Sequence, residues 1–263
     1  MGVRGVLLDI DGVLTVSWAP LPGAAEVLAE LTRREMPFRL VTNTSSRTRA
    51  EIARLLADAG MNVGVEHVHT AVSAAAHYLT ERQPHARVFA VNEGDLRPDL
   101  DGVDVVSEDT AAGDIDVVLL GGAGPATGYA QFNRAFRLVQ GGALLLGLQR
   151  AMRYQTADGP SLDMGAFLLG LEAATGVTAT IVGKPARLLF DAPLADLGIA
   201  ADDALMVGDD IDADVRGAQA LGMTGALVRS GKFRDDDLQR GSPDPDHVID
   251  DIRALPDLLD KLH

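Results

Sequence analysis

The chain has 263 residues and no cysteine, which excludes a disulfide framework, a thiolate metal site and a cysteine nucleophile. Its apolar fraction of 47% is enough for a sizeable core, and its charged fraction of 23% is typical of folded proteins rather than of extended disorder. The net charge of -15 argues against nucleic acid and anionic lipid as partners, because both attract basic surfaces.

Short apolar runs alternate with helical patterns along the chain. In order, the predicted strands are residues 3–8, 38–41, 88–91, 117–120, 144–148, 179–182, 204–207 and 226–228. Most of these runs are continuous rather than alternating, which is typical of parallel strands buried on both faces. The predicted helices are residues 23–34, a segment after 46, 72–79, 129–139, 165–175, 185–197 and 212–221. This alternation predicts an α/β fold with a doubly wound parallel sheet.

The middle third of the chain differs from the rest. Residues 82–178 contain predicted strands and helices of their own, loops rich in Gly and Asp, and few residues suited to catalysis. We therefore expect a second domain at 82–178, inserted into a core formed by residues 1–81 and 179–263. The polar segment 234–246 is expected to be a surface loop before a last helix.

Four of the predicted strands lead directly into polar residues. Those residues are Asp9, Asp11, Thr42, Asn43, Lys184, Asp209 and Asp214. In an open parallel sheet, ligands bind beyond the carboxyl ends of the strands. We therefore expect Asp9, Asp11, Thr42, Asp209 and Asp214 to gather in one crevice, with Lys184 entering beside them.

Aspartates crowded into one crevice favour a particular chemistry. Neighbouring carboxylates raise one another's pKa unless a cation neutralises them, and oxygen ligands suit Mg²⁺. Magnesium and Lys184 opposite the aspartates can hold a phosphoryl group. Asp9 can attack phosphorus, and Asp11 can donate a proton to the leaving oxygen and later accept one from water. Thr42 and the backbone amides after it can bond phosphoryl oxygens.

The order of these residues resembles that of phosphatases in the haloacid dehalogenase superfamily. Asp9-Ile10-Asp11-Gly12 resembles the first motif, Thr42-Asn43 the second and Gly183-Lys184-Pro185 the third. Gly208-Asp209-Asp210 through Asp214 resembles the fourth. An insertion between the second and third motifs resembles the C2-type cap of subclass IIA, which includes pyridoxal-phosphate, nucleotide and p-nitrophenyl phosphatases. The resemblance implies a Rossmann-like core and an α/β cap that closes over small substrates.

The resemblance also implies which residues react and which bind metal. Asp9 matches the nucleophile and Asp11 the acid/base. Mg²⁺ is expected on the Asp9 carboxylate, the Asp11 backbone carbonyl and Asp209. Independently of the resemblance, Asp210 and Asp212 are expected to cap the helix that begins near Asp212 rather than to bind metal. Because true dehalogenases lack the acid/base aspartate, Asp11 indicates a phosphatase.

The remaining matched residues are expected to bind the phosphoryl group and to orient the residues or water around it. Lys184 should pair with the phosphoryl group and with Asp9, and Thr42 and Asn43 should bind the phosphoryl oxygens. Asp214 should orient Lys184 or metal-bound water.

Three residues of the middle third are candidates for substrate choice. Tyr154, Asp163 and Met164 fall where related caps present specificity residues. Asp163 can equally cap a helix, and Met164 can equally pack in a core. The sequence does not choose between these roles.

We therefore expect a Mg²⁺-dependent phosphatase that hydrolyses small phosphorylated metabolites through an aspartyl phosphate. Phosphoamides (phospholysine or phosphohistidine) and inorganic pyrophosphate are the alternative substrates that the resemblance suggests. A receiver-type signalling domain carries similar residues in another chain order, without an acid/base aspartate. A phosphate-binding protein without turnover is disfavoured by Asp11.

We expect a cytoplasmic protein without a membrane or nucleic-acid partner. The first apolar run is short and is interrupted at Asp9, unlike the apolar region of a signal peptide. The resemblance to pyridoxal-phosphate phosphatases also makes a homodimer through the cap an expectation.

Overall fold

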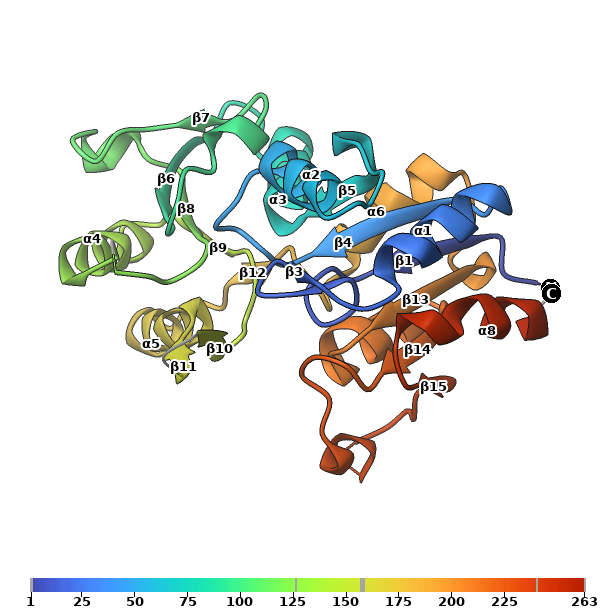
Figure 1. Cartoon of the computed structure of the whole chain (residues 1–263). Helices are drawn as coiled ribbons and strands as arrows, with labels where there is room; N and C mark the ends of the chain where they lie inside the picture. Colours follow the sequence, from blue (N-terminus) through green and yellow to red (C-terminus); the bar gives the residue numbers. More distant parts are fainter. Residues whose placement is uncertain (1, 126, 157–158, 240, 263) are drawn as a thin grey trace. The chain divides into compact units, whose positions relative to one another are not determined.

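The computed structural model describes residues 2–125, 127–156, 159–239 and 241–262 (Figure 1). The chain divides into two compact units. The terminal unit comprises Met1–Thr42, Arg49–His69 and Lys184–His263, and the middle unit comprises Asn43–Thr48 and Thr70–Gly183. The assignment of a core to 1–81 and 179–263, and of a cap to 82–178, stays a prediction.

A parallel sheet forms the centre of the terminal unit. Its strands are β1 (Gly5–Leu8), β4 (Phe38–Thr42), β5 (Val68–Thr70), β13 (Ala204–Gly208), β14 (Thr224–Val228) and β15 (His247–Ile249). They lie in the order β15-β14-β13-β1-β4-β5. Leu8 of β1 aligns with Val207 of β13 and with Leu40 of β4. The carboxyl ends of these three strands therefore meet at one edge. A hairpin of β2 (Thr15–Val16) and β3 (Ala19–Pro20) follows β1.

Helices cover both faces of this sheet. They are α1 (Ala24–Arg33), α2 (Arg49–Asp58), α6 (Arg187–Leu197), α7 (Gly217–Gln219) and α8 (Leu255–Leu262). Shorter turns are η1 (Val65–His67), η4 (Ala201–Asp203), the π-helical η5 (Ile211–Arg216), η6 (Asp235–Gln239) and η7 (Ile252–Ala254). On β1, Val6 and Leu8 pack with α1, α2 and α8, whereas Leu7 packs with α6 and α7. The strand is apolar throughout because both faces are buried, which confirms the doubly wound fold.

The middle unit has its own parallel sheet. Its strands are β6 (Arg87–Val91), β7 (Asp104–Val105), β8 (Val117–Leu120), β9 (Leu144–Gly147) and β12 (Thr180–Ile181), in the order β12-β9-β8-β6-β7. The unit also contains α3 (Ala71–Arg82), η2 (Arg97–Asp99), η3 (Ala112–Asp114), α4 (Tyr129–Gln140), α5 (Met164–Thr175) and the antiparallel hairpin β10 (Arg153–Thr156)–β11 (Gly159–Leu162). Phe89 and Val118 on the sheet pack with Leu138 of α4 and Leu168 of α5.

Every predicted strand is present, but short strands were missed and one predicted helix differs. β5, β7, β15 and the two hairpins escaped prediction because they are short and carry polar residues such as His69 and Asp104. The predicted helix 212–221 is instead the π-helical η5 followed by the single turn α7. In the described part of the chain, no helix is long and apolar enough to span a membrane.

His69 on β5 is a buried titratable group away from the strand ends just described. Its Nε2 atom lies 3.2 Å from Oδ2 of Asp196 on α6. Burial lowers the pKa of His69 to about 4; Asp196 opposes this shift, and the charges of Arg49 and Arg39 add to it. The fold therefore holds His69 neutral at neutral pH.

This burial predicts a pH dependence of stability. The folded pKa lies below the ordinary value of 6.5, so the contribution of His69 is complete above pH 6.5 and declines as the pH falls toward 4. Between about pH 7.5 and pH 5, we expect wild type to lose about 2 kcal/mol more unfolding free energy than His69→Gln, measured by urea denaturation. The exposed His77 offers a control, and His77→Gln should follow wild type. Parallel curves for wild type and His69→Gln would contradict the prediction.

Candidate functional site

Three neighbouring strands bring polar side chains to one edge of the terminal-unit sheet. Asp9 follows β1, Thr42 ends β4 and Asp209 follows β13. The ladder continues beyond β1, because the backbone N–H of Asp9 donates to the carbonyl of Val207 over 2.9 Å. All three polar side chains are buried. The parallel register therefore gathers these residues as the sequence predicted.

The ammonium of Lys184 joins this edge into one charged cluster. Its Nζ atom lies 2.8 Å from Oδ1 of Asp9 and 2.7 Å from Oδ1 of Asp214. The ammonium also donates to the carbonyl of Val41 over 3.0 Å. Burial of the side chain, which is 3% exposed, opposes the charged form, but Asp214 and Asp9 outweigh it and raise the pKa of Lys184. Lys184 therefore stays charged and connects three separate segments.

Asp214 reaches the cluster because η5 packs closely against the end of β13. A Cβ atom at Gly208 would lie 2.2 Å from the Asp214 side chain, so only glycine fits there. Oδ2 of Asp214 accepts a hydrogen bond from the backbone N–H of Asp210 over 3.1 Å. Burial raises the pKa of Asp214 to about 7, although Lys184 opposes the shift. Both oxygens of Asp214 are thus engaged, which suits a residue that orients Lys184.

Asp210 has the capping role that the sequence predicted, but Asp212 does not, because its carboxylate accepts from Arg216 over 2.7 Å. Oδ1 of Asp210 accepts hydrogen bonds from the backbone N–H groups of Asp212 and Ala213, at 3.1 and 3.0 Å. These are donors of the first turn of η5, which helical bonding leaves unsatisfied.

The segment after β14, residues 229–233, fixes the orientation of Asp209; we call it the β14 loop. The backbone N–H of Lys232 donates to Oδ2 of Asp209 over 2.7 Å. The Ser230 hydroxyl donates to the carbonyl of Gly12 over 2.7 Å. A Cβ atom at Gly12 or Gly231 would lie 2.0 or 2.2 Å from Oδ2 of Asp209, and both glycines have positive φ. Two glycines therefore let both loops close on this carboxylate.

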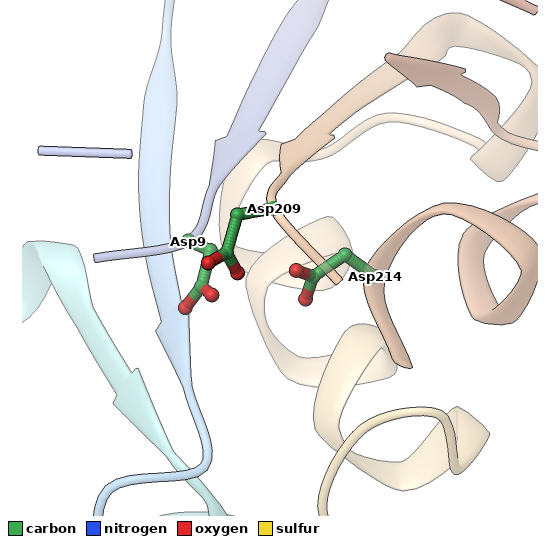
Figure 2. A group of neighbouring side chains, drawn as sticks. All are labelled: Asp9, Asp209 and Asp214. Carbon is green, nitrogen blue, oxygen red and sulfur yellow. The ribbon is translucent and has the colours of Figure 1, made fainter. Parts of the chain in front are cut away.

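The aspartates of the cluster fit a divalent cation. Asp9, Asp209 and Asp214 each offer a carboxylate oxygen, and these oxygens lie within 4.8 Å of one another (Figure 2). Among the described residues, Oδ1 of Asp209 is buried and accepts no hydrogen bond. Burial, reinforced by the charge of Asp9, raises the pKa of Asp209 to about 8. A hard cation such as Mg²⁺ would satisfy this oxygen and offset the repulsion.

Asp11 lies beside the cluster with its side chain open to solvent. Its Oδ1 accepts a hydrogen bond from the backbone N–H of Ser17, in the β2–β3 hairpin, over 3.1 Å. The protein atoms around the carboxyl raise its pKa by desolvation, and the charge of Asp9 adds to this, while the Ser17 bond opposes it. A raised pKa suits a carboxyl group that donates a proton near neutral pH.

Asn43, the other predicted phosphate-binding residue, belongs to the middle unit although it follows Thr42 directly. A Cβ atom at Gly183 would lie 2.5 Å from Oδ1 of Asn43 and 2.2 Å from the carbonyl of Leu148. Gly183 therefore leaves room for Asn43 at the point where the chain leaves the middle unit.

The three candidates for substrate choice also lie in the middle unit. Tyr154 on β10 is 40% exposed. Asp163 caps α5, because its Oδ1 accepts from the backbone N–H of Met164 over 2.7 Å, and it also accepts from Gln149 over 2.7 Å. Met164 is fully buried in the core of the unit. Asp163 and Met164 thus have the capping and packing roles that the sequence left open, and a role in substrate choice stays a prediction.

Ser230 and Lys232 are two polar residues near the cluster that were not predicted from the sequence. Both residues follow within a few positions of the predicted strand 226–228, and this strand neighbours β13 in the sheet. Polar residues after a buried strand are the signal that singled out Asp209. The same signal applies to the β14 loop.

The chain matches known hydrolases over most of its length. Residues 6–106 match the haloacid dehalogenase-like hydrolase family, and residues 181–255 match a family described as HAD-hydrolase-like. The phospholysine phosphohistidine inorganic pyrophosphate phosphatase of Mus musculus is 35% identical over 98% of this chain and 94% of its own.

Solved phosphatase structures share the whole fold. The p-nitrophenyl phosphatase from Archaeoglobus fulgidus is 26% identical with a TM-score of 0.90, over 100% of both chains. The glycerol phosphate phosphatase from Mycobacterium tuberculosis, in complex with magnesium, is 29% identical with a TM-score of 0.86, over 97% of this chain and 76% of that chain.

The close approach of the β14 loop to Asp209 predicts a specific effect of Gly231→Ala. The new methyl group would displace the Asp209 carboxylate, so we expect the affinity for Mg²⁺ to fall about tenfold or more, measured by titration calorimetry. Gly222 also has positive φ, but a Cβ atom there would meet nothing within 4 Å. Gly222→Ala should therefore lower the melting temperature through backbone strain while keeping the Mg²⁺ affinity. Equal affinities in the two variants would show that the loop does not position Asp209.

Proposed function

We propose that this chain, which belongs to the haloacid dehalogenase-like hydrolases and is an enzyme of the phosphatase type, acts on small phosphate esters. In this proposal, hydrolysis proceeds through a phosphorylated Asp9. The observation that carries this proposal is the environment of Asp9. Its carboxylate lies against the ammonium of Lys184 and near the carboxylate of Asp209. Oδ1 of Asp209 is buried and accepts no hydrogen bond among the described residues.

Asp9 is held in a position suited to nucleophilic attack. Its Oδ1 accepts from the backbone N–H of Ile10 over 2.8 Å and pairs with Lys184. These bonds leave Oδ2 as the attacking oxygen. Attack forms a bond between Oδ2 and phosphorus, and the bond from phosphorus to the leaving oxygen breaks.

Asp11 moves the protons in this proposal. In the first half-reaction its protonated carboxyl donates to the leaving oxygen. In the second half-reaction its carboxylate accepts a proton from water as the water oxygen attacks phosphorus and the bond to Asp9 breaks. The raised pKa of Asp11 and its exposure to solvent support both roles.

The residues present fit Mg²⁺, and the Asp9 carboxylate, the Asp11 backbone carbonyl and Asp209 would hold it. When bound, Mg²⁺ neutralises the negative charge that otherwise separates a phosphate dianion from the aspartates. Asp214 keeps Lys184 charged and in place, and Thr42 and Asn43 would bind phosphoryl oxygens.

Phosphate esters are the first candidate substrates, and phosphoamides or inorganic pyrophosphate are the second. The second group is favoured by the 35% identity to a phosphatase named for phospholysine, phosphohistidine and inorganic pyrophosphate. A cap at 82–178 would exclude water and set this choice through Tyr154, Asp163 or Met164. Assembly as a homodimer through the cap and a cytoplasmic location are part of the same proposal.

Separate roles for Asp9 and Asp11 give the decisive experiment. Asp11→Asn keeps the nucleophile but loses the base that activates water. With p-nitrophenyl phosphate, whose leaving group hardly needs a proton, we expect a burst of nitrophenol followed by a stall. Mass spectrometry at the stall should show one added phosphoryl group on Asp9. Asp9→Asn should give neither burst nor adduct.

Two results would contradict this mechanism. One is a phosphoryl group on a residue other than Asp9. The other is an active Asp9→Asn enzyme that forms no adduct, which would indicate direct attack by water. A receiver-type or non-catalytic protein would instead release no phosphate steadily in the wild type.

The two consecutive aspartates after β13 offer a matched pair for testing the metal site. Asp209→Ala removes a proposed ligand, and we expect phosphatase activity to fall on the order of 10²-fold or more. Asp210→Ala removes the cap of η5, so we expect a loss of about 1 kcal/mol in stability with a much smaller loss of activity. EDTA should abolish the wild-type activity and Mg²⁺ should restore it. Equal rate losses in the two variants, or full activity after chelation, would exclude Asp209 as the ligand.

A further inference from the structure

Lys232 is held at the edge of the cluster by its main chain. Its backbone N–H donates to Oδ2 of Asp209 over 2.7 Å. Two residues earlier, the Ser230 hydroxyl donates to the Gly12 carbonyl over 2.7 Å. These bonds tie the β14 loop to the segment after β13 and to the segment after β1. The Cα atom of Lys232 therefore has a fixed place beside the proposed nucleophile and metal ligands.

The side chain of Lys232 is much less constrained than that of Lys184. It is 62% exposed, and its Nζ atom lies 3.9 Å from Oδ2 of Asp210, too far for a hydrogen bond. Lys184 is 3% exposed and holds Asp9, Asp214 and the Val41 carbonyl. Lys184 is therefore held in place by contacts within the protein, whereas the ammonium of Lys232 can turn toward a molecule that enters from solvent.

An exposed lysine side chain carries its positive charge at neutral pH without help from its surroundings. The carboxylates of Asp209, Asp9 and Asp210 act on this ammonium electrostatically. Those same carboxylates repel any substrate whose leaving group carries negative charge of its own. A mobile cation beside them offsets that repulsion.

We propose that Lys232 binds a second anionic group, carried by the leaving group of the substrate. The preferred substrates are then phosphorylated metabolites with a further carboxylate or phosphate, rather than phosphate esters of neutral alcohols. This inference rests on the proposed phosphatase function. Lys232 is thus a specificity-determining residue supplied by the terminal unit rather than by the expected cap.

A matched pair of substrates tests this inference. Phosphoglycolate carries a carboxylate in its leaving group, whereas 2-hydroxyethyl phosphate carries a hydroxyl group of similar size. We expect Lys232→Met to lower the ratio of kcat/KM for phosphoglycolate over 2-hydroxyethyl phosphate by about tenfold or more. The change should lie mainly in KM, because the contact is present before and during phosphoryl transfer.

Two control variants separate this role from a general effect of charge. Lys232→Arg keeps a cation at the same place and should retain most of the wild-type ratio. Lys261 is an exposed lysine on α8, so Lys261→Met removes the same charge elsewhere on the terminal unit and should leave the ratio unchanged.

The alternative is that Lys232 only shields Asp209 and Asp210 from each other. In that case Lys232→Met slows both substrates by the same factor, and the inference is overturned. A fall in the ratio that Lys261→Met reproduces also overturns it. Failure of the proposed function appears separately, because a wild-type enzyme that is not a phosphatase hydrolyses neither ester.

Discussion

The charge of Lys184 is the constraint on which the arrangement of the site depends. A buried ammonium is stable only when opposite charges and hydrogen-bond acceptors surround it, and Asp9, Asp214 and the Val41 carbonyl provide both. In return, Lys184 lets two carboxylates lie close together inside the protein. It does so between segments that are far apart in the sequence. Asp9, the proposed nucleophile, is thus oriented by an ion pair that also holds β1, β4 and η5 together.

The second requirement of the site is space between the packed segments, and glycine provides it where the backbone lies against a carboxylate of the cluster. Gly208 admits Asp214, while Gly12 and Gly231 admit Asp209. A side chain at any of these positions would push a carboxylate away from its neighbours. The charged groups and the glycines therefore form one unit, because the electrostatic arrangement exists only where the backbones pack this closely. Lys232 joins the same arrangement through its backbone N–H, which donates to Asp209.

Much of the terminal unit could be predicted from sequence because its signals are strong. β1 is apolar on both faces, and Asp9, Thr42 and Asp209 follow buried strands whose parallel order brings their ends together. β5 could not be predicted from the sequence, because one of its three residues is His69, which interrupts the apolar pattern. The π-helical turn of η5 could not be predicted, because its apolar residues have the same spacing as those of an α-helix. The middle unit gave weaker signals for function, since Asp163 and Met164 have residue types that serve a helix cap or a core equally well.

The chain passes between its two units four times, and two of these crossings, Thr42–Asn43 and Gly183–Lys184, lie next to a residue of the proposed site. The other two crossings are Thr48–Arg49 and His69–Thr70. A chimaera that exchanged the middle unit for that of a relative would therefore need junctions at all four peptide bonds. The donor segment would have to bring its own partner for Gly183, because Asn43 and Leu148 fill the space above that glycine. An exchange of residues 70–183 alone would therefore separate Gly183 from its native Asn43, so the segments 43–48 and 70–183 have to be exchanged together.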